Sequence, residues 1–327
     1  MDVAIVGCGL IGQKRATVLG AHRLVVAADN DSEKAQALAA SRAGAVASTD
    51  WRAAIARADV DTVLVSTPHH LLAPVAIAAA EAGKHVLVEK PAARNAAELA
   101  PLVEAARQAK VVVKVGFNHR FHPAFRKARE YVDAGALGEL MFARARYGHG
   151  GRVGYDKEWR ADPSISGGGE LLDQGMHLID LSRWFLGDFV RVEGFTHTYF
   201  WDMPVDDNAF MALRTSGEQM AWLHVSWTEW KNTFSFELYG KTGKLHVEGL
   251  GGSYGTERLS YYRMSAQMGP PETVIHEYPG ADQSWALDFA DFVRSVETGR
   301  EPCGGLDDAL EALQVVDAIY GTGTSSW

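Results

Sequence analysis

The stretch V-A-I-V-G-C-G-L-I-G, from Val3 to Gly12, decides the fold of the first part of the chain. Its first four residues form an apolar run typical of a buried parallel strand, and the run leads directly into a G-x-G-x-x-G motif that opens a helix. The first glycine makes the tight turn, the second lets a pyrophosphate approach the backbone, and the third lets helix and strand pack closely. The sequence therefore predicts dinucleotide contacts from the motif residues Gly7, Gly9, Leu10, Ile11 and Gly12.

A second strand, over residues 23–28, ends in Asp29. An acidic side chain in this place accepts hydrogen bonds from the adenosine ribose of a dinucleotide. Because an anionic Asp29 repels a 2′-phosphate and no arginine follows it directly, the sequence favours NAD over NADP. The alternative, an aspartate that merely ends a strand, is disfavoured by the complete βαβ pattern around it.

Two further strands, 62–66 and 85–88, alternate with predicted helices and continue the parallel sheet. In an open parallel sheet the carboxyl ends of the strands line the ligand crevice. A lysine that precedes a proline at the end of a buried strand is unlike an ordinary surface lysine, whereas a loop histidine is a real alternative for His69. We expect cofactor contacts from the residues that follow these strands: Thr67, Pro68, His69, Glu89 and Lys90.

The segment 166–187 reads S-G-G-G-E-L-L-D-Q-G-M-H-L-I-D-L-S-R-W-F-L-G. If it is helical from about Glu170, Asp173 and His177 lie one turn apart on one face, and Asp180 follows on that face. A carboxylate orients an imidazole and stabilises its protonated form, while the ring exchanges a proton near neutral pH. The pattern thus predicts an acid–base pair; a solvated pair on a surface helix is the equal alternative.

Length and composition exclude several classes of protein. The chain has 327 residues, enough for two domains, and ordinary globular proportions of 47% hydrophobic and 22% charged residues. The net charge of −9 and the absence of a basic run argue against a nucleic-acid partner. Two cysteines, no basic leader and no long apolar run predict a cytoplasmic protein without a membrane span. The histidines show no metal-ligand spacing, so no metal is expected.

Three segments together resemble the Gfo/Idh/MocA oxidoreductase family: the glycine motif at 7–12, A-G-K-H-V-L-V-E-K-P at 82–91, and G-G-G-E-L-L-D-Q-G-M-H-L-I-D at 167–180. The resemblance covers nearly the whole chain. It implies an α/β protein whose N-terminal Rossmann domain, a doubly wound parallel sheet, precedes a C-terminal α/β domain with a large, open, mostly antiparallel sheet. By position it implies that Lys90 is the active-site lysine, Asp173 the aspartate of the family motif and His177 the catalytic histidine.

The resemblance further implies an NAD-dependent dehydrogenase acting on a secondary hydroxyl of a sugar, inositol or nucleotide sugar. His177 then acts as general base or acid with Asp173 and Lys90, in agreement with the chemistry of hydride transfer from a carbinol. Two rival functions are an NAD-dependent glycosidase, which oxidises a sugar transiently and eliminates the aglycone, and a non-catalytic sensor of NAD or sugar. One departure concerns substrate positioning, because His69 and Leu72 replace the Asn and His of many relatives.

We expect a domain boundary after residue 119, giving a dinucleotide-binding domain over 1–119 and a substrate-binding and oligomerisation domain over 120–327. At the boundary, Asn118 resembles a family position near nicotinamide and substrate, and Arg120 is a candidate ligand for a polyhydroxyl or anionic group; a hinge held by hydrogen bonds is the equal alternative. The long loop 148–168 adds the substrate candidates Tyr155, Trp159 and Arg160, with a loop fixed by buried aromatic side chains as the alternative.

Beyond residue 187 the apolar pattern has period two, which predicts strands over 190–200, 208–213, 220–227, 233–239 and 244–248. Short turns between them predict antiparallel pairing. An open sheet must cover its free face, and aromatic residues such as Trp222 offer surface for a homodimer or homotetramer through this sheet, with core packing as the alternative. A last helix, at about 306–320, is expected to pack back on the first domain.

Overall fold

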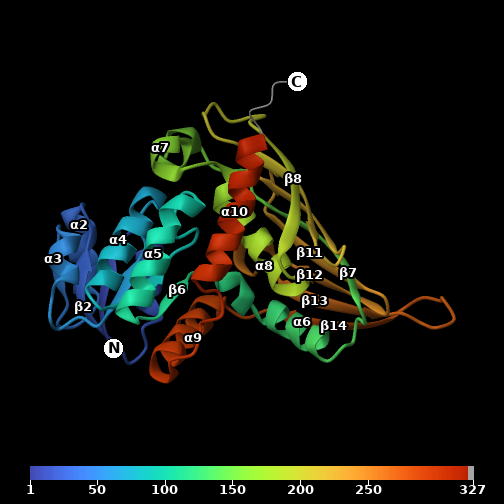
Figure 1. The fold of residues 1–327 in the computed structure, drawn as a ribbon, viewed down its shortest axis with the longest axis horizontal. Helices are drawn as coiled ribbons and strands as arrows, with labels where there is room; N and C mark the ends of the chain where they lie inside the picture. The colour runs from blue at the N-terminus through green and yellow to red at the C-terminus, as the bar shows by residue number, and fades with distance from the viewer. Residues whose placement is uncertain (323–327) are drawn as a thin grey trace. The chain divides into compact units, whose positions relative to one another are not determined.

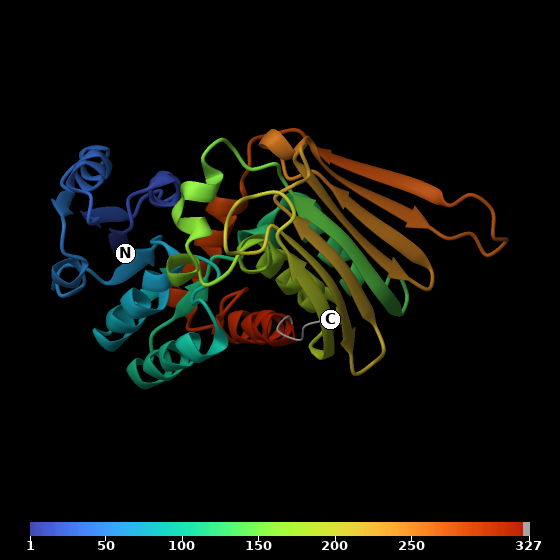
Figure 2. The same cartoon turned by 90° about the horizontal axis from the view of Figure 1, so that it is seen from above.

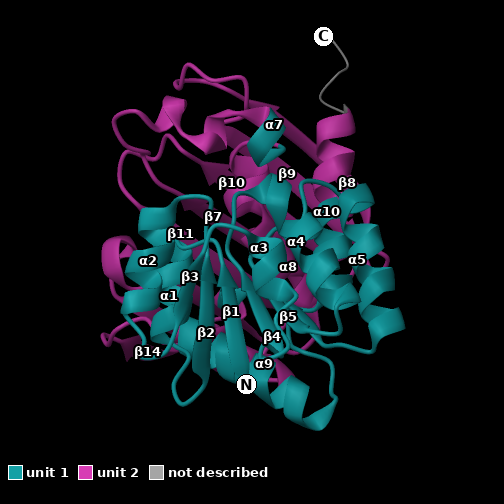
Figure 3. Ribbon diagram, turned by 90° about the vertical axis from the view of Figure 1, so that its left-hand side faces the viewer, with its two compact units in different colours: residues 1–118, 164–167, 285–313 teal, residues 119–163, 168–284, 314–327 magenta. Residues whose placement is uncertain are grey.

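The computed structural model describes residues 1–322, so the last five residues of the expected second domain lie outside it. The chain forms two compact units, shown in teal and magenta in Figure 3. Unit 1 comprises residues 1–118, 164–167 and 285–313, and unit 2 comprises residues 119–163, 168–284 and 314–327. The domain boundary expected after residue 119 stays a prediction.

Unit 1 contains a six-stranded parallel sheet in the order β3-β2-β1-β4-β5-β6, which is the doubly wound arrangement expected from the sequence. Its central strands are buried on both faces, as the apolar runs predict; Val3, Ala4 and Ile5 have no exposed surface. The strands are β1 (Asp2–Val6), β2 (Arg23–Ala28), β3 (Val46–Ser48), β4 (Thr62–Val65), β5 (His85–Val88) and β6 (Val113–Val115).

Side-chain caps determine where several helices of this unit begin. Asp31, Asp50 and Asn95 accept hydrogen bonds from backbone N–H groups in the first turns of α2, α3 and α5. Figure 1 shows α4 and α5 beside each other along the sheet. The helices are α1 (Leu10–Thr17), α2 (Ser32–Ala40), α3 (Trp51–Ile55), α4 (His69–Glu81), α5 (Ala96–Ala109) and α9 (Ser284–Thr298).

Unit 2 is built on an eight-stranded sheet in the order β14-β13-β12-β11-β7-β10-β9-β8. Every neighbouring pair is antiparallel except β7 and β10, which are parallel. The strands are β7 (Leu140–Gly148), β8 (Phe189–His197), β9 (Asn208–Thr215), β10 (Met220–Ser226), β11 (Thr233–Gly240), β12 (Gly243–Glu248), β13 (Glu257–Arg263) and β14 (Glu272–Tyr278).

One face of this sheet is buried and the other is exposed. Along β7, Ala143, Ala145 and Tyr147 are buried while Phe142 and Arg144 point to the opposite face. Figures 1 and 2 show α6 (Pro123–Asp133) and α8 (Met176–Leu186) against the buried face. Within the described residues, no helix of unit 2 covers the other face in these views.

The sheet contains more strands than the sequence predicts. Two strands, β13 and β14, were not predicted; β14 is an edge strand with mostly exposed residues, so it lacks the buried alternation that marks a strand. The predicted, mostly antiparallel pairing is confirmed, and the one parallel pair among the described strands of this sheet arises because β7 lies between β10 and β11. Strands joined by short turns are antiparallel, but β7 comes from a distant part of the chain.

The last helix, α10 (Leu306–Thr322), contributes residues to both units. No helix in the described part of the chain is long and apolar enough to cross a membrane. Over the same residues, no cluster of three or more His, Cys, Asp or Glu side chains has the arrangement of a metal site.

Candidate active site

The glycine motif forms a tight turn between β1 and α1 in unit 1. Gly7 has a φ of +92°, and an added Cβ would lie 2.5 Å from the carbonyl oxygen of Ser66. A Cβ on Gly12 would lie 2.0 Å from the carbonyl oxygen of Gly7, so the third glycine is required for the helix to start where it does. An added Cβ at Gly9 meets no atom within 4 Å, which leaves this backbone open to a ligand.

Asp29 holds this loop from the end of β2. One carboxylate oxygen accepts a hydrogen bond from the backbone N–H of Cys8 at 2.7 Å, and the other accepts one from Asp31 at 2.9 Å. Helix α1 has no side-chain cap at its N-terminus, and its first residue, Leu10, is 70% exposed. The first backbone N–H groups of α1 are thus available to an anion, as dinucleotide binding requires.

Polar atoms at the end of β4 also fit a ligand. The hydroxyls of Ser66 and Thr67 are buried and have no hydrogen-bond partner among the described residues. Buried polar groups in proteins are almost always paired, so these hydroxyls are available to an ordered water or to a bound ligand. Together with the open backbone at Gly9, these hydroxyls make the residues present suitable for a dinucleotide.

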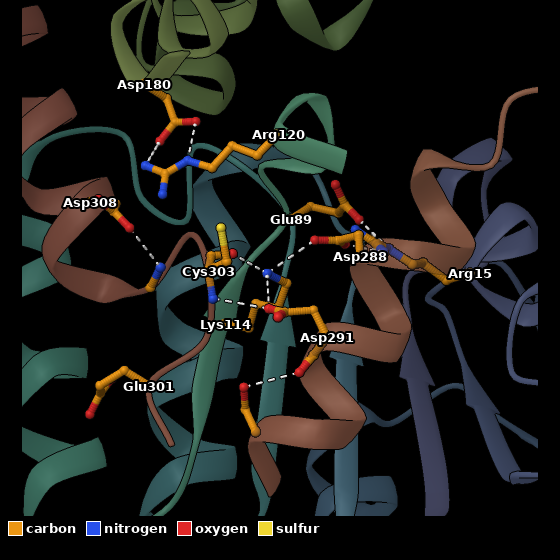
Figure 4. Close-up of polar contacts among 12 residues, drawn as sticks. Arg15, Glu89, Lys114, Arg120, Asp180, Asp288, Asp291, Glu301, Cys303 and Asp308 are labelled. Carbon is orange, nitrogen blue, oxygen red and sulfur yellow. Dashed lines mark hydrogen bonds and ion pairs between the residues drawn. The ribbon is translucent and has the colours of Figure 1, made fainter. Parts of the chain in front are cut away.

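Glu89, which precedes Lys90, belongs to a buried network of charges in unit 1 (Figure 4). Its carboxylate accepts a hydrogen bond from Nε of Arg15 at 2.6 Å, and the same guanidinium donates to Asp288 at 2.6 Å. Lys114 lies 3.3 Å from Asp288 and extends the network. Burial raises the pKa of the Glu89 carboxyl, and the Arg15 cation opposes this effect.

The network fixes the chain just before Lys90, whose side chain is half-buried. Gly116 provides space for the network, because a Cβ there would lie 2.8 Å from Oε2 of Glu89 and 2.9 Å from a guanidinium nitrogen of Arg15. The predicted contact of Glu89 with the cofactor stays a prediction, since the carboxylate has protein partners in this structure.

His69 is the first residue of α4 and is buried. Its Nδ1 lies 2.8 Å from the carbonyl oxygen of Ser166, which joins α4 to the segment 164–167 of the same unit. Pro68 forms the N-terminal boundary of α4, as expected for a residue with an extended conformation. Contacts of both residues with the cofactor stay predictions.

Two of the glycines at 167–169 are explained by close contacts within unit 2. An added Cβ on Gly168 would lie 2.3 Å from the hydroxyl of Tyr320, and one on Gly169 would lie 1.9 Å from the carbonyl oxygen of Asp206. The carboxylate of Asp206 accepts hydrogen bonds from the backbone N–H groups of Gly169 and Leu171, at 3.0 and 2.8 Å. Asp206 thereby fixes the start of the helical segment that carries Asp173.

That segment is not the continuous α-helix predicted from Glu170. Residues Leu171–Gly175 form a π-helical turn, η4, and the α-helix α8 begins at Met176. The wider turn changes the angular relation between Asp173 and His177 that an α-helix would give them. An added Cβ on Gly175 would lie 3.2 Å from the side chain of Leu171 and 3.5 Å from that of Val225, so this residue packs closely against both.

The three polar residues predicted for this segment have different partners. Asp173 accepts a hydrogen bond from Nε of Arg160 at 3.0 Å. Asp180 forms a buried bidentate pair with Arg120, at 2.6 and 2.9 Å (Figure 4). A role of Arg120 as a substrate ligand stays a prediction, because its guanidinium is held by Asp180 here.

The ring of His177 lies face to face with that of His119, with centroids 3.7 Å apart and planes at 18°. His119 belongs to the 3-10 turn η1 (Asn118–Phe121), and both rings are buried. Nε2 of His119 lies 3.3 Å from the hydroxyl of Tyr147 on β7. Burial raises the pKa of Tyr147 well above its usual value, so the phenol keeps its proton at neutral pH.

The loop candidates occupy different environments. Tyr155 is only 2% exposed and packs edge-on against Trp227 at 5.0 Å. The guanidinium of Arg160 lies 4.5 Å from the ring centroid of Trp159, and both side chains are partly exposed. Asn118 is buried in η1. The substrate contacts of these residues stay predictions.

Sequence reasoning missed His119, Tyr147 and Asp206. Each is distant in sequence from the segment that it contacts, and none stands in a motif with characteristic spacing. The sheet register and the loop 198–207 bring them to that segment, so no local pattern could have identified them.

Two protein families match successive parts of the chain. "Oxidoreductase family, NAD-binding Rossmann fold" matches residues 1–117, and "GFO/IDH/MocA C-terminal domain" matches residues 125–246. Both matches agree with the resemblance noted in the sequence and together cover most of the chain.

Two relatives of known activity and one solved structure are similar to this chain. The dTDP-3,4-didehydro-2,6-dideoxy-alpha-D-glucose 3-reductase of Streptomyces violaceoruber is 30% identical over 98% of this chain and 94% of its own length. Levoglucosan dehydrogenase of Pseudarthrobacter phenanthrenivorans is 34% identical over 66% of this chain, and the match spans 58% of that relative. The structure of a levoglucosan dehydrogenase with NADH and levoglucosan has a TM-score of 0.89, 24% identity and coverage of 99% of this chain and 96% of that one.

Proposed function

The chain belongs to the Gfo/Idh/MocA family of NAD(P)-binding oxidoreductases, and on this basis we propose that it is an NAD-dependent dehydrogenase acting on a secondary hydroxyl of a sugar, inositol or nucleotide sugar. The observation that carries the proposal is that one buried segment, 171–186, holds an imidazole and a carboxylate in a chain that also forms a dinucleotide loop. The activities of the similar enzymes support the substrate class, since both act on sugar derivatives by their names.

In this function, His177 accepts the hydroxyl proton when the alcohol is oxidised and returns it when the ketone is reduced. Arg160 donates a hydrogen bond to Asp173 and thereby holds in place the π-helical turn that precedes His177. Lys90 supplies a positive charge that stabilises the developing alkoxide. The nicotinamide supplies the hydride acceptor or donor.

We propose NAD as the cofactor rather than NADP. The carboxylate of Asp29 is fixed by the N–H groups of Cys8 and Asp31, at the position where a ribose hydroxyl is read in this fold. A fixed negative charge there repels a 2′-phosphate. The residues that hold the dinucleotide in this proposal are Gly7, Gly9, Leu10, Ile11, Gly12, Asp29 and Thr67.

We further propose that a second copy of the chain covers the exposed face of the large sheet. Phe195 pairs with Phe210 across β8 and β9, and Trp222 projects from β10 nearby; the side chains of Phe195 and Trp222 are 62% and 58% exposed. Contiguous exposed aromatic surface on a folded protein marks an interaction site. A symmetric dimer buries the same patch on both subunits.

A substrate panel tests the dehydrogenase proposal. NADH formation is measured by fluorescence near pH 9 and near pH 7 with inositols, free aldoses, glycosides, sugar acids and nucleotide sugars, and His177→Ala is the control. Turnover of one class that is lost in the variant supports the proposal. Release of an aglycone without net NADH would instead support a glycosidase, and silence across the panel with intact NAD binding would support a sensor.

A further inference from the structure

The rings of His119 and His177 are in contact, so this part of unit 2 contains two titratable rings rather than one. Centroids 3.7 Å apart and planes at 18° place the two imidazoles in full face-to-face contact. Both side chains are buried, so little water separates or screens them. Two positive charges at this distance repel each other strongly, and the repulsion grows as the surroundings become less polar.

We propose that His119 and His177 act as one acid–base unit that holds at most one proton near neutral pH. This inference rests on the proposed role of His177 and extends it to His119, a positioning residue. Once either ring is protonated, the second proton binds only at distinctly lower pH. The unit therefore always contains one neutral imidazole over the pH range between its two steps, and this is the form that a general base requires.

Other ionisable groups surround the pair and set where its two steps lie. From β7, the phenol of Tyr147 contacts His119 and lies 6.4 Å from His177 between ring centroids. From the N-cap of α6, His122 meets His119 edge-on at 5.4 Å and pairs with Glu257 of β13. Further ionisable groups on the described elements of unit 2 that carry or adjoin the pair are Glu170 at the N-cap of η4, Asp173 with Arg160, Tyr254 beside Tyr147, and the Arg120–Asp180 pair.

These neighbours shift the protonation equilibrium of each ring, but they do not remove the coupling between the rings. The carboxylate of Asp173 is bound by Arg160, which reduces the effect of its negative charge on the pair. Glu257 pairs with His122 and accepts a hydrogen bond from the N–H of Ala124, so its negative charge acts mainly on the start of α6. The repulsion between two protonated rings depends only on their separation and surroundings.

Nuclear magnetic resonance with histidine labelled at Cε1 measures this coupling directly in the full-length protein. In the wild type, the two midpoints of the pair are determined; His119→Phe and His177→Phe then give the midpoint of each remaining ring beside an uncharged one. The sum of the two wild-type midpoints should lie roughly one to three pH units below the sum of the two single-ring midpoints. Equal sums would overturn the proposal.

Control variants separate this coupling from a merely structural role. His276→Phe removes an imidazole on β14 that bonds to Tyr131, and it should leave the sum for the pair unchanged. If either phenylalanine variant fails to fold, His119→Asn and His177→Asn provide the same comparison without the aromatic ring. A shift in the midpoint of His177 that is as large in His276→Phe as in His119→Phe would also contradict the proposal, because it would show a general effect of losing a histidine.

The coupling and the proposed function are tested by separate measurements, so either can fail without the other. The titrations use the protein without substrate, whereas the base role is tested by sugar oxidation in His177→Ala. A coupled pair in an inactive protein would retain this inference and remove the dehydrogenase proposal. An active enzyme in which the two sums of midpoints are equal would retain the dehydrogenase proposal and remove this inference.

Discussion

The carboxylate of Glu89 and the guanidinium of Arg15 form a buried ion pair at 2.6 Å that joins the residue before Lys90 to the helix following the glycine motif. Both partners are almost completely buried, and Asp288 shares the same guanidinium. The position of the proposed active-site lysine in unit 1 is therefore coupled to the helix that follows the dinucleotide loop.

Breaking this pair should destabilise unit 1 strongly. Glu89→Gln leaves part of the positive charge of Arg15 uncompensated in the interior, which costs on the order of 3–5 kcal/mol. Urea unfolding measures the loss. Glu104→Gln, in an exposed pair with Arg107, is the matched control and should change stability little. Equal effects of the two substitutions would show that the buried pair is not important.

Removing the charge of Asp29 should change cofactor preference. Asp29→Asn keeps an acceptor oxygen for the loop but no longer repels a 2′-phosphate, so the ratio of the NADP to NAD dissociation constants should fall roughly tenfold or more. Calorimetric titration with both nucleotides measures the ratio. Asp31→Asn, which changes the neighbouring helix cap, should leave the ratio unaltered. An unchanged ratio in Asp29→Asn would exclude this residue as the source of the preference.

Gly169→Ala should disturb the start of the π-helical turn. Its Cβ would lie 1.9 Å from the carbonyl oxygen of Asp206, and backbone atoms cannot yield as a flexible side chain can. We expect a loss of about 1–3 kcal/mol in unfolding free energy, as in other overpacked sites, and lower activity. Gly280→Ala, where an added Cβ meets no atom within 4 Å, is the control. Wild-type stability of Gly169→Ala would contradict the described packing.

Glu237 should make the large sheet sensitive to acid. Although burial alone raises its pKa, hydrogen bonds from Arg144 and Lys244 lower the pKa of Glu237 to about 2. Because the folded state has the lower pKa, the stabilisation is complete above about pH 4.5 and is lost as the pH falls towards 2. Urea unfolding of wild type and Glu237→Gln between pH 6 and pH 3 should give curves that converge on the acid side. A constant difference would contradict this origin of the acid sensitivity.

Charging the exposed face of the sheet should prevent self-association. Trp222→Glu places a charge in the centre of the aromatic patch, so the proposed dimer or tetramer should dissociate while the subunit stays folded. Size-exclusion chromatography with light scattering measures the mass. Leu287→Glu, at an exposed apolar residue of α9, is the control. A wild-type that is monomeric at all concentrations would exclude the proposed assembly.

Local patterns predicted much of unit 1 correctly. The run Val3–Val6 and the glycine motif predicted β1, the turn and α1, because each element depends on neighbouring residues and on backbone conformations that only glycine adopts. The alternating pattern likewise predicted β8 to β12. It failed at β14, whose exposed residues show no buried face.

The candidate site was predictable only in part. Asp173 and His177 share one short segment with a recognisable motif, so the sequence identified both. The π-helical turn between them was not predicted, because it depends on packing against the sheet and on Asp206 rather than on the residues of the segment.

The sequence by itself determined the dinucleotide loop, which follows from the spacing of glycines after an apolar run, whereas the two-part α/β architecture and the motif segment follow from its resemblance to a known family. Only the tertiary structure decided that His119 stacks on His177, that Asp180 pairs with Arg120 and that β7 runs parallel to β10. These contacts join residues far apart in the chain. Their geometry depends on how strands and helices pack, and no local sequence pattern encodes that packing.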